Sequence, residues 1–222
     1  AKNFAKWCRK RARKPFGTCT VCAGYKARLA AAARDKEELQ RIKEEFVQHL
    51  LMQKIERGIY YKHRAKGMKG EAISIIIDGM DQSKLTLPHY KLKPKDVAGF
   101  LETKITGVLV HGKCFDCYVS EPQVKHDSNL NLTCLHNTLM KLLKSYESGT
   151  SPRILYLQVD GGSENKNQWM ISYLSLLIEA GLFDKIKMCF LPVGHTHEDI
   201  DQAMAGILPD SRTFEQTRCL DI

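Results

Sequence analysis

Residues 72–78 read AISIIID and residues 153–160 read RILYLQVD. Both runs are short and rich in large or β-branched apolar residues, a composition typical of strands that are buried on both faces. Each run ends in a carboxylate, Asp78 in the first and Asp160 in the second. Because 82 positions separate these two residues, no single local turn explains both. The runs therefore predict a sheet that carries acids at the ends of its strands.

The residues between and after these runs alternate between strand and helix patterns. The turn His111-Gly-Lys113 joins two β-branched segments into a predicted hairpin. Residues 169–182 are apolar nearly all round, so we expect a deeply buried helix there. Helices between the later strands imply parallel pairing, with the hairpin at an edge of the sheet. The predicted elements are strands at 72–78, 100–110 and 114–120, a helix at 132–146, a strand at 153–160, a helix at 169–182, a strand at 185–191 and a helix at 197–207.

The composition fits a folded chain with one substantial domain and a smaller appendage. The chain has 222 residues, of which 43% are hydrophobic, which is enough for a core. No apolar run reaches the roughly 18 residues that a membrane span needs, and no apolar stretch follows the basic start as in a signal peptide. We therefore expect no membrane partner and a nuclear or cytoplasmic location, where the eight cysteines are reduced thiols, some of them on metal.

The positive charge is concentrated at the front of the chain. Residues 1–66 contain 18 Lys and Arg against 6 Asp and Glu, a net charge of +12, whereas residues 67–222 contain 16 against 19, a net charge of −3. Gly67 and Gly70 then predict a linker. We divide the chain into a basic helical region at 1–66, a main domain at 72–207 and an irregular tail at 208–222. The asymmetry predicts DNA contact by Lys6, Arg9, Lys10, Arg11, Arg13 and Lys14.

The front region also carries the ligand pattern of a structural zinc site. Cys19 and Cys22 form a Cys-x-x-Cys turn, and a helix that begins near Asp35 places His49 beside an apolar face. That face consists of Leu39, Ile42, Phe46 and Leu50. Two thiolates and one imidazole leave one position of a zinc tetrahedron to fill, and both His63 and Cys8 are open as the fourth ligand. A second pair, Cys114 and Cys117, lies in a predicted strand, where residues three apart face opposite ways, so we interpret these as buried thiols.

The order of elements, with acids after the first and fourth strands, resembles the ribonuclease-H-like superfamily over residues 72–207, and DDE/DDD transposases and integrases most of all. The stretches QVDGGSENKN at 158–167 and GHTHEDIDQ at 194–202 are similar to an uncharacterised transposase-derived family in which a zinc knuckle precedes the catalytic-type domain. The expected fold is thus α/β, a ribonuclease-H-like mixed sheet of order β-β-β-α-β-α-β-α behind a small helical zinc-knuckle region.

The resemblance implies a nucleotidyltransferase domain that acts on DNA by two-metal-ion phosphoryl transfer. Two Mg²⁺ or Mn²⁺ ions would lie on Asp78, Asp160 and a third acid, because hard divalent ions prefer carboxylate oxygens. The third acid has three candidates. Asp199 ranks first, because it lies seven residues after Pro192 and three before Gln202, as the glutamate of retroviral integrases does. Asp201 ranks second, from the family's Asp-x-Asp motif, and Glu198 ranks third.

Other residues near these motifs are candidates for supporting roles. His195 and His197 each lie four residues before an acid of the last helix, so they are expected to support the metal ligands, to contact DNA phosphate or to ligate metal. Asp81 is an alternative to Asp78, which we prefer. Glu164 is expected to begin the helix after Asp160, where an acid favours the helix dipole.

The sequence is also compatible with two alternative functions. One is a domesticated, catalytically inactive DNA-binding or interaction protein. The tail at 208–222 favours it, because its sequence does not continue the last predicted helix. The other is a metal-dependent nuclease without strand transfer. A homo-oligomer is a further partner that the pattern leaves open.

Overall fold

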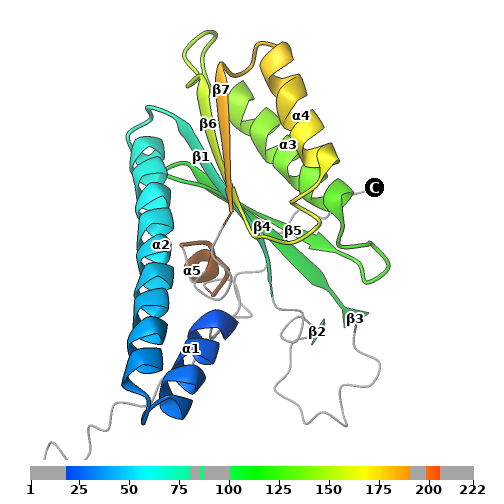
Figure 1. The fold of residues 1–222 in the computed structure, drawn as a ribbon. Coiled ribbons are helices and arrows are strands. Elements are labelled where there is room, and N and C mark those ends of the chain that lie inside the picture. The colour runs from blue at the N-terminus through cyan, green and yellow to red at the C-terminus, as the bar shows by residue number, and fades with distance from the viewer. Residues whose placement is uncertain (1–18, 81–85, 88–100, 191–198, 206–222) are drawn as a thin grey trace, which may run out of the picture. The chain divides into compact units, whose positions relative to one another are not determined.

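The computed structural model describes residues 19–80, 86–87, 101–190 and 199–205, and every structural statement below concerns these residues (Figure 1). They fall into two compact units, which divide between Met52 and Gln53. Each unit is described by itself. Within the described ranges, no helix combines the length and the apolar character needed to cross a membrane.

The second unit is an α/β unit built on a mixed five-stranded sheet of order β5-β4-β1-β6-β7. β4 pairs antiparallel with β1 and β5, whereas β6 pairs parallel with β1 and β7. This arrangement confirms the predicted α/β class, the parallel later strands and the hairpin at an edge. The strands of this sheet and the helices that pack on it are, in chain order, β1 (Ile73–Gly79), β4 (Lys104–Val110), β5 (Cys114–Ser120), α3 (Ser128–Lys144), β6 (Ile154–Val159), α4 (Gln168–Glu179), β7 (Lys185–Phe190) and α5 (Asp199–Ala205).

The predicted strand at 100–110 is divided in the structure. β3 (Leu101–Glu102) pairs with β2 (Thr86–Leu87) in a separate two-stranded sheet, and β4 begins at Lys104. The longer β4 then pairs along its whole length with β5. The main sheet therefore receives only the second part of that β-branched run.

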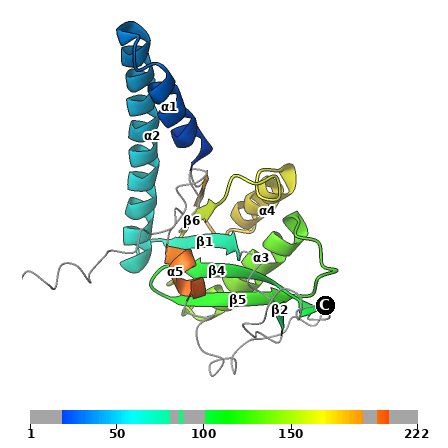
Figure 2. The ribbon, with the colours of Figure 1, turned by 90° about the horizontal axis from the view of Figure 1, so that it is seen from below.

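The two faces of the sheet are covered by different helices (Figures 1 and 2). Because side chains alternate along a strand, Ile73, Ile75 and Ile77 of β1 join the core formed with α3 and α4. Ile76 points the other way and packs with Ile200 and Met204 of α5. Asp78 shares the parity of Ile76, so it belongs to the face that α5 covers.

The prediction that the helix at 169–182 is buried nearly all round is wrong. Only one side of α4 packs on the sheet and α3, with Met170, Leu174 and Leu177 buried. α4 lies beside α3 in the single helical layer on this side of the sheet (Figure 1). Its flanks therefore leave large apolar side chains exposed, namely Trp169, Ile171, Leu176 and Ile178.

The predicted linker at Gly67 and Gly70 is a tight helix end instead. α2 (Lys36–Met68) continues through Gly67, and Gly70 then adopts a positive φ of 73°. The amide of Gly70 donates to the carbonyl of Gly67 at 3.0 Å, and the amide of Glu71 donates to the carbonyl of Lys66 at 3.0 Å. This pair of hydrogen bonds forms a Schellman cap. Ile73 of β1 follows at once, so residues 53–68 of α2 are fixed next to the sheet in the second unit.

Two glycines of α2 are expected to respond to alanine in opposite directions. A Cβ on Gly67 would lie 2.7 Å from Cβ of Ser74, whereas a Cβ on Gly58 would meet nothing within 4 Å. We expect Gly67→Ala to destabilise the fold by about 1–3 kcal/mol through overpacking. Gly58→Ala should stabilise it by about 0.5–1 kcal/mol through helix propensity. Urea unfolding followed by circular dichroism measures both, and a stabilising Gly67→Ala would contradict this packing.

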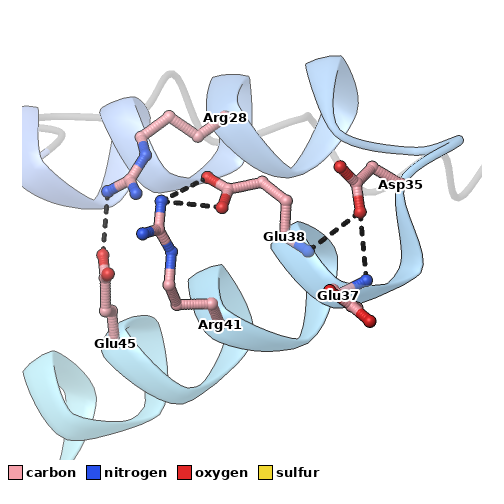
Figure 3. Close-up of polar contacts among 6 residues, drawn as sticks. All are labelled: Arg28, Asp35, Glu37, Glu38, Arg41 and Glu45. Carbon is pink, nitrogen blue, oxygen red and sulfur yellow. Dashed lines mark hydrogen bonds and ion pairs between the residues drawn. The ribbon is translucent and has the colours of Figure 1, made fainter.

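The first unit contains α1 (Thr20–Ala31) and the front part of α2. Asp35 caps α2, where its carboxylate accepts from the amides of Glu37 and Glu38 at 3.1 Å, which agrees with the predicted helix start. Arg28 pairs with Glu45 across the two helices at 2.9 Å (Figure 3). On the predicted apolar face Ile42 is buried, but Leu50 is 43% exposed. The described core of this unit is thin.

Candidate metal centres

The first candidate centre lies where β1 and β6 end. The parallel register pairs Ile76 with Gln158, and two further steps along each strand bring Asp160 beside Asp78. Both residues share the parity of the face that α5 covers. They line one pocket of about 150 Å³. The structure thus brings together the two acids on which the sequence prediction depends.

Asp160 is held in place by a chain of amides. Its Oδ1 accepts from Nδ2 of Asn165 at 2.6 Å and from the amide of Gly162 at 3.2 Å. Asn165 is buried, and its own Oδ1 accepts from Nδ2 of Asn131 in α3 at 3.0 Å. Because both donors to Asp160 reach the same oxygen, they fix the plane of the carboxylate, as the supporting hydrogen bonds of metal ligands commonly do.

Asp201 reaches this centre from α5. Ile200 and Met204 are spaced by four residues and are buried on β1 and β4, which anchors this short helix. Gly107 of β4 makes room for it, because a Cβ there would lie 2.5 Å from Cε of Met204. With α5 held in this way, Asp201 is near enough to Asp78 to raise the pKa of the Asp78 carboxyl.

The pKa of Asp78 is raised to about 7 from its ordinary value of 3.8. Burial is the largest cause, and the negative charges of Asp201 and then Asp160 add to it, against a hydrogen bond from the Gly79 amide that lowers the pKa. Carboxylates that raise the pKa of a neighbour in this way repel one another. A bound cation would relieve that repulsion.

The raised pKa predicts a stability difference that depends on pH. Between pH 4 and 7 the folded chain holds a proton on Asp78 that the unfolded chain releases, so stability falls as pH rises through this window and levels above pH 7. Asp78→Asn removes this dependence. Without added divalent metal, we expect its gain in unfolding free energy over wild type to be larger at pH 8 than at pH 5, by on the order of 2–3 kcal/mol. Urea unfolding at both pH values measures it, and equal gains would contradict the shift.

Asp199 lies in a different environment, although the sequence ranked it first as the third acid. Its Oδ2 is 2.7 Å from Nε of Arg64 in α2 and accepts from the Tyr60 hydroxyl at 3.5 Å. Nε2 of the buried His111 is 3.7 Å away. Burial is the main cause that lowers the pKa of His111, with Arg64 acting in the same direction and Asp199 against it. Asp199 therefore fastens the start of α5 to α2.

His126 and Lys104 also line the acid pocket, and the sequence analysis identified neither. Nζ of Lys104 donates to the carbonyls of Pro122 and Val124 at 3.0 and 2.7 Å and so holds the segment before His126. His126 lies against Gly79, where a Cβ would be 3.1 Å from its Nε2. The only signal in the sequence is that His126 precedes Asp127, which caps α3.

The prediction that Glu164 begins a helix is wrong. α4 begins at Gln168, and the side chain of Asn167 caps it by accepting from the amide of Met170 at 3.0 Å. Asn167 also donates to the carbonyl of Glu164 at 2.7 Å, which ends the preceding turn. Several other predicted residues lie outside the described part of the chain, namely Asp81, His195, His197 and Glu198, together with Lys6, Arg9, Lys10, Arg11, Arg13 and Lys14.

The second candidate centre joins Cys19, Cys22 and His49 in the first unit. Sγ of Cys19 is 3.5 Å and Sγ of Cys22 is 3.3 Å from Nε2 of His49. Zinc bonded to sulfur at about 2.3 Å and to nitrogen at about 2.0 Å sets a tetrahedral edge of about 3.5 Å. Both thiols are buried, and the three ligand atoms lie within 4.8 Å of one another. These residues could hold a metal ion such as zinc, as the sequence predicted.

His63 does not lie with these ligands. Its ring stacks on Tyr156 of β6 at 3.8 Å, and its Nδ1 is 4.0 Å from Sγ of Cys189. It follows His49 by fourteen helical residues, or about 21 Å along α2. Cys8, the other candidate for the fourth ligand, lies outside the described residues. Cys114 and Cys117 are half-buried, and burial raises the pKa of both thiols.

The second unit is thus an α/β unit with converging carboxylates, and the first carries a Cys-Cys-His cluster. Residues 93–215 match a family model described as a domain of unknown function, DUF7869. The match covers more than half of the chain, so the chain belongs to this family. No curated protein and no solved structure matches it.

Proposed function

We propose that this chain is a ribonuclease-H-like polynucleotidyl transferase of the transposase and integrase type that acts on DNA. The observation that supports it most is the convergence of three acids from separate elements. Asp78 and Asp160 share one pocket at the ends of adjacent parallel strands, and Asp201 of α5 acts on Asp78. A purely structural role for three neighbouring, half-buried carboxylates would be costly, whereas metal-assisted phosphoryl transfer requires them.

In this proposal Asp78, Asp160 and Asp201 hold two Mg²⁺ or Mn²⁺ ions. When bound, such ions stabilise the attacking and leaving oxygens of a phosphodiester and lower the pKa of bound water. The chain's own residues set the geometry. Asn165 orients the Asp160 carboxylate, and the Asp199–Arg64 ion pair with the buried Ile200 holds α5 in a position where the charge of Asp201 acts on Asp78. Asp201 thus replaces Asp199 as the preferred third acid.

The front unit complements this centre. Zinc on Cys19, Cys22 and His49 would join α1 to α2. Because the described core of this unit is thin, such a link would stabilise its fold. The basic residues of 1–66 would then contact DNA phosphates ahead of the catalytic unit.

Cleavage of a labelled DNA duplex with Mn²⁺ or Mg²⁺ tests the proposal. Wild type should cleave, Asp160→Asn should not, and the exposed surface variant Asp184→Asn should behave as wild type. Strand-joined products distinguish a transferase from a plain nuclease. Metal-independent DNA binding without any cleavage would favour the inactive DNA-binding protein instead.

A further inference from the structure

A group of cations surrounds Tyr156 on the face of the sheet that α5 covers. Nζ of Lys66 in α2 lies 5.9 Å from the centre of the Tyr156 ring and donates to its hydroxyl at 3.5 Å. His63, one turn earlier in α2, stacks on the same ring. Lys187 of β7 is the register partner of Tyr156 in the neighbouring strand. One tyrosine is therefore the centre of three basic side chains from two elements.

Lys185 extends this group along β7. Ile186, Met188 and Phe190 face the core formed with α3 and α4, so by alternation Lys185 and Lys187 face the opposite side. Both lysines are exposed, and Lys66 is exposed as well. We call Lys66, Lys185 and Lys187 the Tyr156 lysines.

These charges have no acidic partner within the part of the chain that the structure describes. None of the Tyr156 lysines makes an ion pair there with a carboxylate, although Arg64, two residues before Lys66, pairs with Asp199. The crowding of like charge also acts on His63. Burial lowers the pKa of this imidazole most, and the positive charges of Lys187 and Lys66 lower it further. An anion between these side chains would be favoured on electrostatic grounds.

The position of the Tyr156 lysines relative to the pocket of Asp78 and Asp160 indicates which kind of anion they bind. Tyr156, Gln158 and Asp160 share one face along β6, and four residues of a strand span about 13 Å. A nucleic-acid strand that passes Asp160 along this face of β6 would therefore carry a further phosphate near Tyr156. Lysines bind phosphate as point charges without reading the base sequence.

We propose that the Tyr156 lysines bind the phosphate backbone of the DNA strand whose reacting phosphate lies at Asp78 and Asp160. The placement of the reacting phosphate rests on the proposed function, whereas the backbone contact itself does not. The sequence analysis placed DNA contact only in residues 6–14, so this is a separate surface, in the catalytic unit.

Fluorescence anisotropy with a labelled DNA duplex of arbitrary sequence tests the contact, without added divalent metal and in an Asp160→Asn background. Lys66→Gln/Lys187→Gln is compared with Lys113→Gln/Lys144→Gln, which removes equal charge from the other side of the sheet. There Lys113 lies over Tyr146 and Lys144 is in the last turn of α3. Two lost phosphate contacts should weaken binding on the order of tenfold or more at 0.1 M salt and lower the slope of log K against log salt by about 2.

Lys187→Gln alone, at an exposed strand position, should show about half of the change in slope, which guards against loss of folding in the double variant. Equal affinity and equal slope for the two double variants would overturn the inference, and so would a wild-type chain that does not bind DNA. Failure of the proposed function is seen separately, as absence of metal-dependent cleavage in chains with Asp160 intact while the effect of the lysines on binding remains.

Discussion

Asp201→Asn is expected to reduce metal-dependent DNA cleavage by about 10³-fold or more, because it removes a proposed metal ligand whose charge acts on Asp78. Stabilisation of developing charge by a catalytic metal is worth several kcal/mol, and each 1.36 kcal/mol is a factor of ten in rate. The kinetics of cleavage at saturating Mn²⁺ measure this loss. The thermal unfolding midpoint should change little, since the buried anchors of α5 are Ile200 and Met204.

Asp199→Asn is the matched comparison, two residues away on the same helix. It removes the ion pair with Arg64 and leaves the carboxylate of Asp201 in place. We therefore expect a loss of stability of about 1 kcal/mol, as for a partly exposed pair, and a smaller loss of activity. Arg64→Gln should reproduce this phenotype. If instead Asp199→Asn abolishes cleavage and Asp201→Asn does not, then the order predicted from integrase spacing holds and the present assignment of the third acid is wrong.

Removal of zinc is expected to unfold the front unit and leave the sheet intact. In the part of that unit that is described, burial is confined to Cys19, Cys22 and Ile42, so little apolar packing remains without metal. Structural zinc contributes about 10–16 kcal/mol in small zinc-binding peptides. Hydrogen exchange after chelation should show loss of protection across α1 and the start of α2, with β1 and β6 still protected.

Cys22→Ser removes one proposed zinc ligand by mutation, and Cys189→Ser is its control, because Cys189 belongs to β7 of the second unit. Wild type and the control should bind one zinc ion per chain. Cobalt substitution reports the number of thiolates through the visible spectrum, and Cys8→Ser then tests the source of a fourth ligand. A zinc-free wild type with full protection of α1 would contradict the structural role.

The sequence predicted the sheet well, because its strands are short β-branched runs with clear ends. Asp78 and Asp160 could be paired in advance, since the carboxyl ends of adjacent parallel strands meet at one edge of a sheet. The sequence does not predict equally well which side of a helix is buried. Met170, Leu174 and Leu177 account for the core side of α4, but nothing in its composition indicates that Trp169 is exposed to solvent.

The third acid shows most clearly where pattern reasoning fails. Ile200 and Met204 form a buried pair at helical spacing, and this pair was a usable signal for the side of α5 that faces the sheet. Asp199 and Asp201 flank that side in opposite directions. Only the packed structure shows that Asp199 on one flank pairs with Arg64, whereas the charge of Asp201 on the other flank raises the pKa of Asp78. His126 likewise comes to the pocket through a segment that Lys104 holds, which no spacing rule describes.

The most direct test of the central claim is Mn²⁺ binding by calorimetry at pH 8, where Asp78 is ionised. The protein is not treated with a chelator, so that any zinc in the front unit is retained. Wild type is compared with Asp78→Asn, Asp160→Asn and the surface control Asp184→Asn. Convergent carboxylates predict binding by wild type and the control, and its loss in both pocket variants. A wild type that binds no Mn²⁺ at millimolar concentration, even with DNA present, would contradict a catalytic metal centre at Asp78 and Asp160.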